Sequence, residues 1–185
     1  MSDYVITTDS NSDVLPEFIK ENDLTIIPQY YSFGDTVYGD ELNMPPHEFY
    51  ETMRKGELPK SQANNPAVIR DKFEKILKEG KNILHIAFSS ALSGSCNNVV
   101  MTANELLEDY PDRKIMVFDS LNASLGEGVS VYRAVELWKE GKSMEEVYDI
   151  LMEERDHVNV SFTVNDLYHL QRGGRVSKTT AVVGS

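Results

Sequence analysis

Short segments rich in serine recur where β-prone runs of the sequence end, and their chemistry suits anion binding. Ser10 follows the first such run, Ser120 follows a later one, and residues 89–95 place four serines within seven residues directly after an apolar run. Hydroxyls and free backbone N–H groups at the start of a helix form a natural anion site. The sequence therefore predicts that Ser10, Ser93, Gly94 and Ser120 bind an anion. The alternative is that these segments are ordinary helix caps and turns.

Two further segments carry groups of the same kind. Residues 59–66 precede a predicted helix, and capping of that helix explains an asparagine there but does not require Ser61. Residues 170–178 gather three cations around paired glycines in a chain that is otherwise acidic. Paired glycines let a backbone turn tightly towards a ligand, so Gly174 is expected at the site, and Arg175 offers a fork of donors to a carboxylate or phosphate. The alternative for this segment is a solvated turn with surface charges.

Catalytic chemistry has little support in the sequence. Ser93 lacks the Gly-x-Ser-x-Gly elbow of an α/β-hydrolase, and the four histidines lack paired metal-binding spacing. There is no Walker loop and no Rossmann glycine fingerprint. His85 lies within an apolar run and is expected to be a core histidine. Cys96, at a predicted helix start, is expected to be a small structural residue rather than a thiol with a lowered pKa. We expect no catalytic residue, no metal and no cofactor.

Composition limits the partners. The 185 residues carry a formal net charge of -12 and are 41% hydrophobic. An acidic surface repels phosphate backbones and anionic membranes, so nucleic-acid binding is not expected. There is no basic, apolar leader, no apolar run as long as a membrane span, and a single cysteine, all of which fit a cytoplasmic protein. Residues 181–185 are small and apolar without a stop signal, so we expect a partial protein.

Apolar runs with strand character alternate with helical patterns along the chain. Strands are predicted at residues 4–8, 24–28, 82–88, 114–118 and 158–164, and a hairpin at residues 30–40. Helices are predicted at residues 15–21, 45–55, 65–80, 99–107, 131–138 and 143–151. This alternation predicts a three-layer α/β fold with a mainly parallel sheet and helices on both faces. Ligands of such sheets sit beyond the carboxyl ends of the strands, so we expect Ser61 and Ser93 to lie close together there.

Taken together, the segments resemble those of the DegV family. Thr8-Asp9-Ser10 resembles its opening motif, and residues 89–95 resemble its Ser-Ser-Gly-Leu-Ser-Gly-Thr loop, with alanine and serine in place of the third and last residues. Residues 119–128 resemble its Asp-Ser…Ser-x-Gly-x-Gly segment, and residues 170–175 its Leu-x-x-Gly-Gly-Arg motif. The family has Thr-Ser-Gln where this chain has Lys-Ser-Gln, so the carboxylate-binding hydroxyl is placed on Ser61, although Lys60 could align there instead.

The resemblance implies a bacterial carrier that holds a long-chain fatty acid. Its carboxylate would be gripped by serine hydroxyls and an arginine, and offered to the catalytic subunit of a fatty acid kinase. Family chains are longer, with a second domain that covers the ligand. Residues 1–164 are therefore expected to form the N-terminal α/β domain, and residues 165–185 the start of a second domain that is largely missing. CH₂ groups of the ligand that stay exposed to water contribute little binding free energy. Calorimetry should therefore show that this chain binds fatty acid more weakly than a full-length relative does.

Two other functions remain open at this point. Serine-rich loops at strand ends suit the phosphate of a sugar phosphate or another small anion as well as a carboxylate. Histidines and lysines around Ser93 would favour that alternative. The other alternative is a structural or interaction domain without a ligand.

Overall fold

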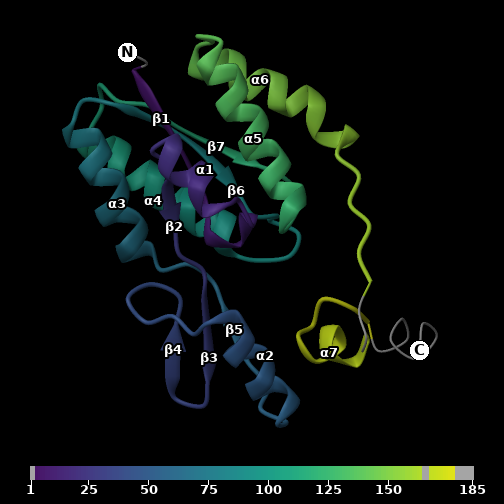
Figure 1. The fold of residues 1–185 in the computed structure, drawn as a ribbon. Helices are drawn as coiled ribbons and strands as arrows, with labels where there is room; N and C mark the ends of the chain where they lie inside the picture. The colour runs from purple at the N-terminus through teal and green to yellow at the C-terminus, as the bar shows by residue number, and fades with distance from the viewer. Residues whose placement is uncertain (1–2, 164–166, 178–185) are drawn as a thin grey trace.

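A four-stranded parallel sheet forms the centre of the protein (Figure 1). The computed structural model describes residues 3–163 and 167–177. The strands lie in the order β2-β1-β6-β7, and every neighbouring pair is parallel. Their bounds are β1 Tyr4–Asp9, β2 Thr25–Ile27, β6 Asn82–Ala87 and β7 Ile115–Asp119.

Helices cover both faces of this sheet, which confirms the predicted three-layer α/β architecture. One face carries α3 (Pro66–Lys78) and α4 (Ser95–Asp109). The other carries α1 (Pro16–Glu21), α5 (Leu125–Lys139) and α6 (Met144–Glu154). Because all four strands run in the same direction, the loops after β1, β6 and β7 meet at one edge.

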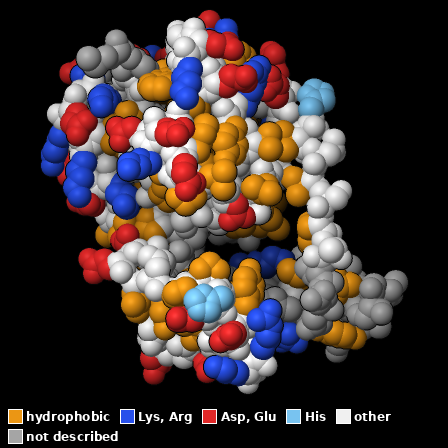
Figure 2. Space-filling view, viewed as in Figure 1, with side chains coloured by type: hydrophobic (Ala, Val, Ile, Leu, Met, Phe, Trp, Pro, Cys, Tyr) orange, Lys and Arg blue, Asp and Glu red, His pale blue; other side chains and the backbone are white. Residues whose placement is uncertain are grey.

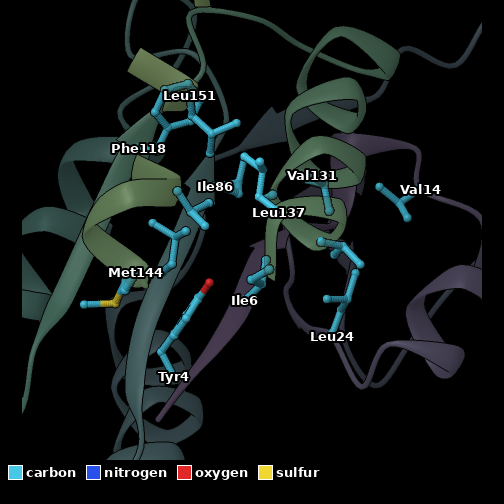
Figure 3. Close-up of a cluster of buried hydrophobic side chains, with 14 residues drawn as sticks. Tyr4, Ile6, Val14, Leu24, Ile86, Phe118, Val131, Leu137, Met144 and Leu151 are labelled. Atoms are coloured by element: carbon cyan, nitrogen blue, oxygen red, sulfur yellow. The ribbon is translucent and has the colours of Figure 1, made fainter. Parts of the chain in front are cut away.

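Each face of the sheet has its own apolar core. On the α5 side, Leu84 and Ile86 of β6 pack with Phe118 and Val131 (Figure 3). On the α3 side, Ile83 packs with residues of α3 and α4. Successive side chains of a strand point to opposite faces, so a strand that is covered on both sides buries consecutive residues, as β6 does at residues 83–87. Four of these five residues are apolar and the fifth is His85, as expected for a parallel strand covered on both sides.

Local sequence signals place the helix starts. Asn65 accepts a hydrogen bond from the Ala67 backbone N–H at 2.9 Å, and Pro66 is the first residue of α3. Ser143 and Glu146 form the predicted capping box at the start of α6. These two starts were readable from the sequence because the capping contacts lie within four residues of chain.

A second, smaller sheet is antiparallel and lies at the carboxyl-edge side of the first (Figure 1). The predicted hairpin is confirmed as β3 (Tyr30–Phe33) and β4 (Thr36–Tyr38). Its third strand, β5 (Lys60–Gln62), pairs with β3 and was not predicted, since the sequence places residues 59–66 only as a polar segment before a helix. The helix α2 (Pro46–Arg54) lies between β4 and β5 in the chain.

The strand predicted at residues 158–164 is wrong for residues 158–163, which have no regular structure; residue 164 lies outside the described residues. Val160 and Phe162 are exposed, and none of the described strands pairs with them. A β-prone run without a neighbouring strand lacks the ladder of hydrogen bonds that stabilises an extended backbone. The remaining elements are two short 3-10 helices, η1 (Ser10–Ser12) and η2 (Arg155–His157), and α7 (Leu167–Arg172). Within the described residues no helix is long and apolar enough to cross a membrane.

Candidate functional site

The serine-rich loop after β6 is held in place by the aspartates that end the two neighbouring strands. Asp9 Oδ2 of β1 accepts a hydrogen bond from the Phe88 backbone N–H at 2.8 Å. Asp119 of β7 accepts from the backbone N–H of Ser90 at 3.1 Å and from its hydroxyl at 2.5 Å. The loop therefore starts from a fixed position between the two strands, and the aspartates of the predicted motifs act on the loop from both sides.

Ser93 belongs to a group of hydrogen-bonded polar side chains in which Ser10 also takes part. The hydroxyls of Ser93 and Ser95 lie 2.9 Å apart, and Ser95 donates to Gln29 Oε1 at 2.8 Å. The backbone N–H of Gln29 donates to the Ser10 hydroxyl at 2.9 Å. Ser10 and Ser93, both predicted site residues, are thus joined through Gln29. Sequence reasoning missed Gln29, which directly follows Pro28 after β2 and has no local motif.

Ser61 lies on β5, whose continuation is tied to the same loop. The Asn64 backbone N–H donates to the Ser95 hydroxyl at 3.3 Å, and the Asn64 side chain donates to the Ser95 carbonyl at 3.2 Å. Ser61 is exposed and Ser93 is half-buried. Lys60, the alternative alignment, points to the opposite face of β5, because neighbouring strand residues alternate. That the Ser61 and Ser93 hydroxyls face one cavity stays a prediction.

Three of the predicted residues, Ser120, Gly94 and Gly174, lie at the ends of strands or helices. Ser120 is fully buried, and its hydroxyl donates to the Ala87 carbonyl at 2.8 Å, which joins the ends of β6 and β7. Gly94 is the N-cap of α4, and a Cβ at that position would meet no atom within 4 Å. Gly174 has φ 78° and donates to the Gln171 carbonyl, so it ends α7 in the manner of a glycine C-cap.

Arg175 is exposed, at the end of the turn that follows α7. Its guanidinium donates to the Gly173 carbonyl, and its backbone N–H donates to the Leu170 carbonyl at 3.1 Å. In this arrangement the side chain folds back onto its own turn. Binding of an anion by Arg175 therefore remains a prediction, and it would require the guanidinium to leave that carbonyl.

A buried acid lies beneath the strand-end loops. Glu127, in the first turn of α5, is fully buried, and burial raises the pKa of its carboxyl from 4.5 to about 9. Repulsion by Asp9 is the second cause. Thr8 Oγ1 lies 3.0 Å from the Ile86 carbonyl and 3.1 Å from Glu127 Oε1. One hydroxyl proton cannot serve both acceptors, so a protonated Glu127 that donates to Thr8, while Thr8 donates to Ile86, satisfies both contacts.

The two residues assigned to structural roles keep them. His85 is fully buried, and its Nδ1 lies 2.9 Å from the Thr7 hydroxyl, as expected of a core histidine. Burial raises the pKa of the Cys96 thiol to about 11, with smaller contributions from Asp119 and Asp9. A thiol with a raised pKa is protonated at neutral pH and a poor nucleophile. Cys96 is therefore better described as a small structural residue than as a reactive thiol.

A cavity of about 960 Å³ lies at the opposite, amino edge of the sheet. Its lining includes Asp3, Lys81 and Lys142, which precede β1, precede β6 and follow α5. The serine-rich loops leave the other ends of the strands. This cavity is therefore separate from the predicted anion site, although its volume alone would draw attention to it.

Comparison with known proteins agrees with the fold. Residues 3–185 match the family model described as an uncharacterised protein of the DegV family. A DegV domain-containing protein of Clostridium perfringens is 38% identical over 187 residues, which cover 100% of this chain and 64% of that protein. The chain thus spans about 64% of the length of this relative.

Two solved structures share the fold. A stearic acid-binding protein from Eubacterium ventriosum superposes with a TM-score of 0.86 at 30% identity, covering 98% of this chain and 64% of that one. A DegV family protein from Thermus thermophilus, whose structure concerns fatty acid binding, gives a TM-score of 0.84 at 30% identity with the same coverage. The family match over nearly the whole chain shows that this protein belongs to the DegV family.

Proposed function

We propose that this protein binds a long-chain fatty acid and holds its carboxylate at the serine-rich loop between β6 and α4. The observation that carries the proposal is the position of Ser93, a half-buried hydroxyl directly before the first turn of α4. A helix N-terminus favours negative charge, and a neutral hydroxyl can donate to a carboxylate without neutralising it. Ser61 and Arg175 are proposed as the further carboxylate donors.

The surroundings of Ser93 favour a carboxylate over a phosphate. The hydrogen-bond partners described for the hydroxyls of Ser93 and Ser95 come from serine, glutamine and asparagine residues, and the strands on either side of β6 end at Asp9 and Asp119. A phosphate carries more charge than a carboxylate and would be repelled more strongly by these two acids. Histidines and lysines, which would favour the sugar-phosphate alternative, are not among these described partners.

Exposed apolar side chains near the same edge suit an acyl chain. Leu92 follows β6, Leu121 follows β7, and Leu125 begins α5, all of them exposed. Figure 2 shows a hollow between the body that holds the parallel sheet and the part below it, with hydrophobic side chains along its borders. Each CH₂ group buried there would contribute roughly 0.8 kcal/mol. We propose that the acyl chain runs from Ser93 across this apolar surface.

A further proposal is that the bound acid is presented to a kinase subunit that phosphorylates its carboxylate. It is supported by the family resemblance and by the proposed hydroxyl donors, which would hold a carboxylate without making it inaccessible. The chain itself would then act as a carrier rather than as an enzyme.

Replacement of Ser93 tests the carboxylate site. We expect Ser93→Ala to weaken stearate binding roughly five- to tenfold, since one hydrogen bond to a charged group is lost. Binding of stearyl alcohol should hardly change, because the alcohol is neutral and makes no charge-assisted hydrogen bond with Ser93. Displacement of a fluorescent fatty acid would measure both dissociation constants. Thr36→Ala, which removes an exposed hydroxyl from β4, is the control and should affect neither ligand. Equal affinity of wild type and Ser93→Ala for stearate would place the carboxylate elsewhere.

A further inference from the structure

The hydroxyl of Ser93 donates towards the protein interior in this structure. Ser95 Oγ lies 2.8 Å from Gln29 Oε1 and 2.9 Å from Ser93 Oγ. An amide oxygen only accepts, and a serine hydroxyl has a single proton. The Ser95 proton is therefore committed to Gln29, and Ser93 must be the donor in its contact with Ser95. With its proton used in this way, Ser93 has none to offer a ligand carboxylate.

Gln29 can reverse the direction of this chain of hydrogen bonds, because its amide carries both a donor and an acceptor. Its Nε2 atom is buried and has no hydrogen-bond partner among the described residues. A buried donor without an acceptor is unfavourable, and rotation of the amide by a half turn exchanges Nε2 and Oε1. After that rotation Nε2 faces Ser95 and donates to it. The unpaired atom is then a carbonyl oxygen, which buried sites tolerate better than an unpaired N–H.

We propose that Gln29 is a positioning residue that sets, through Ser95, the direction in which the Ser93 hydroxyl donates. With the amide reversed, Gln29 Nε2 donates to Ser95, Ser95 donates to Ser93, and Ser93 donates to the ligand carboxylate. No proton leaves its heavy atom; each hydroxyl only rotates. The inference rests on the proposed function, because the outward donor matters only if a carboxylate binds there.

The backbone around Gln29 is fixed, which confines the change to the side chain. Its N–H donates to the Ser10 hydroxyl at 2.9 Å. On the other side, the Ser95 hydroxyl also accepts from the Asn64 N–H at 3.3 Å, and the Ser95 N–H donates to Ser93 Oγ at 3.2 Å. Both hydroxyls thus keep a backbone N–H donor whether the chain of hydrogen bonds runs towards Gln29 or away from it. An acid and an alcohol should differ in their response, since an alcohol can donate to a Ser93 that points inward.

Gln29→Glu tests the reversal because a carboxylate only accepts and cannot turn a donor towards Ser95. We expect this variant to bind stearate about ten- to a hundredfold more weakly than wild type, and stearyl alcohol about as well as wild type. The new charge also repels the ligand directly, so the same change is made in the Ser95→Ala background, where the chain is already cut. There we expect only a few-fold loss from Gln29→Glu, and the difference between the two backgrounds measures the coupling.

Gln29→Met supplies a comparison that leaves Ser95 intact. It is similar in length, neutral and unable to hold the Ser95 proton, so stearate binding should stay within about threefold of wild type. A loss as large as that of Gln29→Glu would mean that position 29 only shapes the site, and would overturn the inference. An equal loss from Gln29→Glu in both backgrounds would overturn it too, while the proposed function stands. Failure of the wild type to bind stearate would overturn the proposed function and the inference with it.

Discussion

At about pH 8 we expect Glu127→Gln to be more stable than the wild type, by several kcal/mol in the free energy of unfolding. The carboxyl of Glu127 is fully buried, and burial raises its pKa from 4.5 to about 9. At neutral pH the unfolded chain carries this group ionised, and folding must add a proton to it. At pH 7 this costs about 3 kcal/mol, which glutamine, neutral and of the same shape, does not incur.

The pH dependence gives the sign of the effect. An acid whose pKa is raised on folding favours the folded state most at a pH below its unfolded pKa. Its contribution to the free energy of unfolding is lost as the pH rises towards its folded pKa. The stability of the wild type should therefore fall between about pH 4.5 and pH 9 through this group. The advantage of Glu127→Gln should grow over the same range, as measured by urea unfolding at several pH values. Glu108→Gln, on the exposed side of α4, is the control and should show no such trend.

A constant difference between Glu127→Gln and wild type from acid to alkaline pH would contradict this assignment, because it would mean that Glu127 does not titrate in that window. A neutral Glu127 also matters for the proposed function. It lies close enough to Asp9 for the two acids to repel, and Asp9 fixes the start of the loop that is proposed to hold a carboxylate. A negative charge on Glu127 would oppose anion binding, so its protonation would favour the proposed site.

The parts of the fold that follow local rules were predictable. Asn65 and Ser143 place the starts of α3 and α6 through contacts within a few residues. The parallel sheet followed from the alternation of apolar strands with helices. Strand β5 was not predictable, because Lys60–Gln62 is polar and exposed on every residue, and it forms a strand only through pairing with β3. Residues 158–163 show the reverse case, a β-prone run with no strand beside it.

The edge of the sheet at which the serine-rich loops lie was predictable, but the contacts within them were not. Serine after a buried strand points to the carboxyl edge, and Ser10 and Ser93 are indeed joined there. Gln29 has no signal in the sequence, because its role depends on a distant contact with Ser95. Glu127 resembles an ordinary acidic residue in the first turn of a helix, and only its burial distinguishes it. The division into residues 1–164 and 165–185 remains a prediction.

In a protein that carries the whole pocket, Arg175→Ala should weaken fatty-acid binding roughly ten- to a hundredfold, because a charge-assisted contact with a carboxylate contributes about 1.5–3 kcal/mol. Its guanidinium is exposed and bonded only to the carbonyl of its own turn among the contacts that are described. It can therefore turn to a ligand at the cost of one exposed hydrogen bond. The same exposure means that folding stability should change little. Binding of the matching fatty alcohol should also change little, since that contact needs a charged ligand.

Two further variants test how the carboxylate is held. Arg175→Lys keeps the charge but loses the planar fork of donors, so an intermediate loss is expected if Arg175 grips both carboxylate oxygens. Lys60→Ala removes an exposed cation from β5 and tests the alternative alignment, in which position 60 rather than Ser61 meets the ligand. Equal losses for acid and alcohol in Arg175→Ala would indicate damage to the shape of the pocket. No loss for either ligand would leave Arg175 as a surface cation on a glycine turn, and the carboxylate would then depend on the hydroxyls of Ser61 and Ser93 alone.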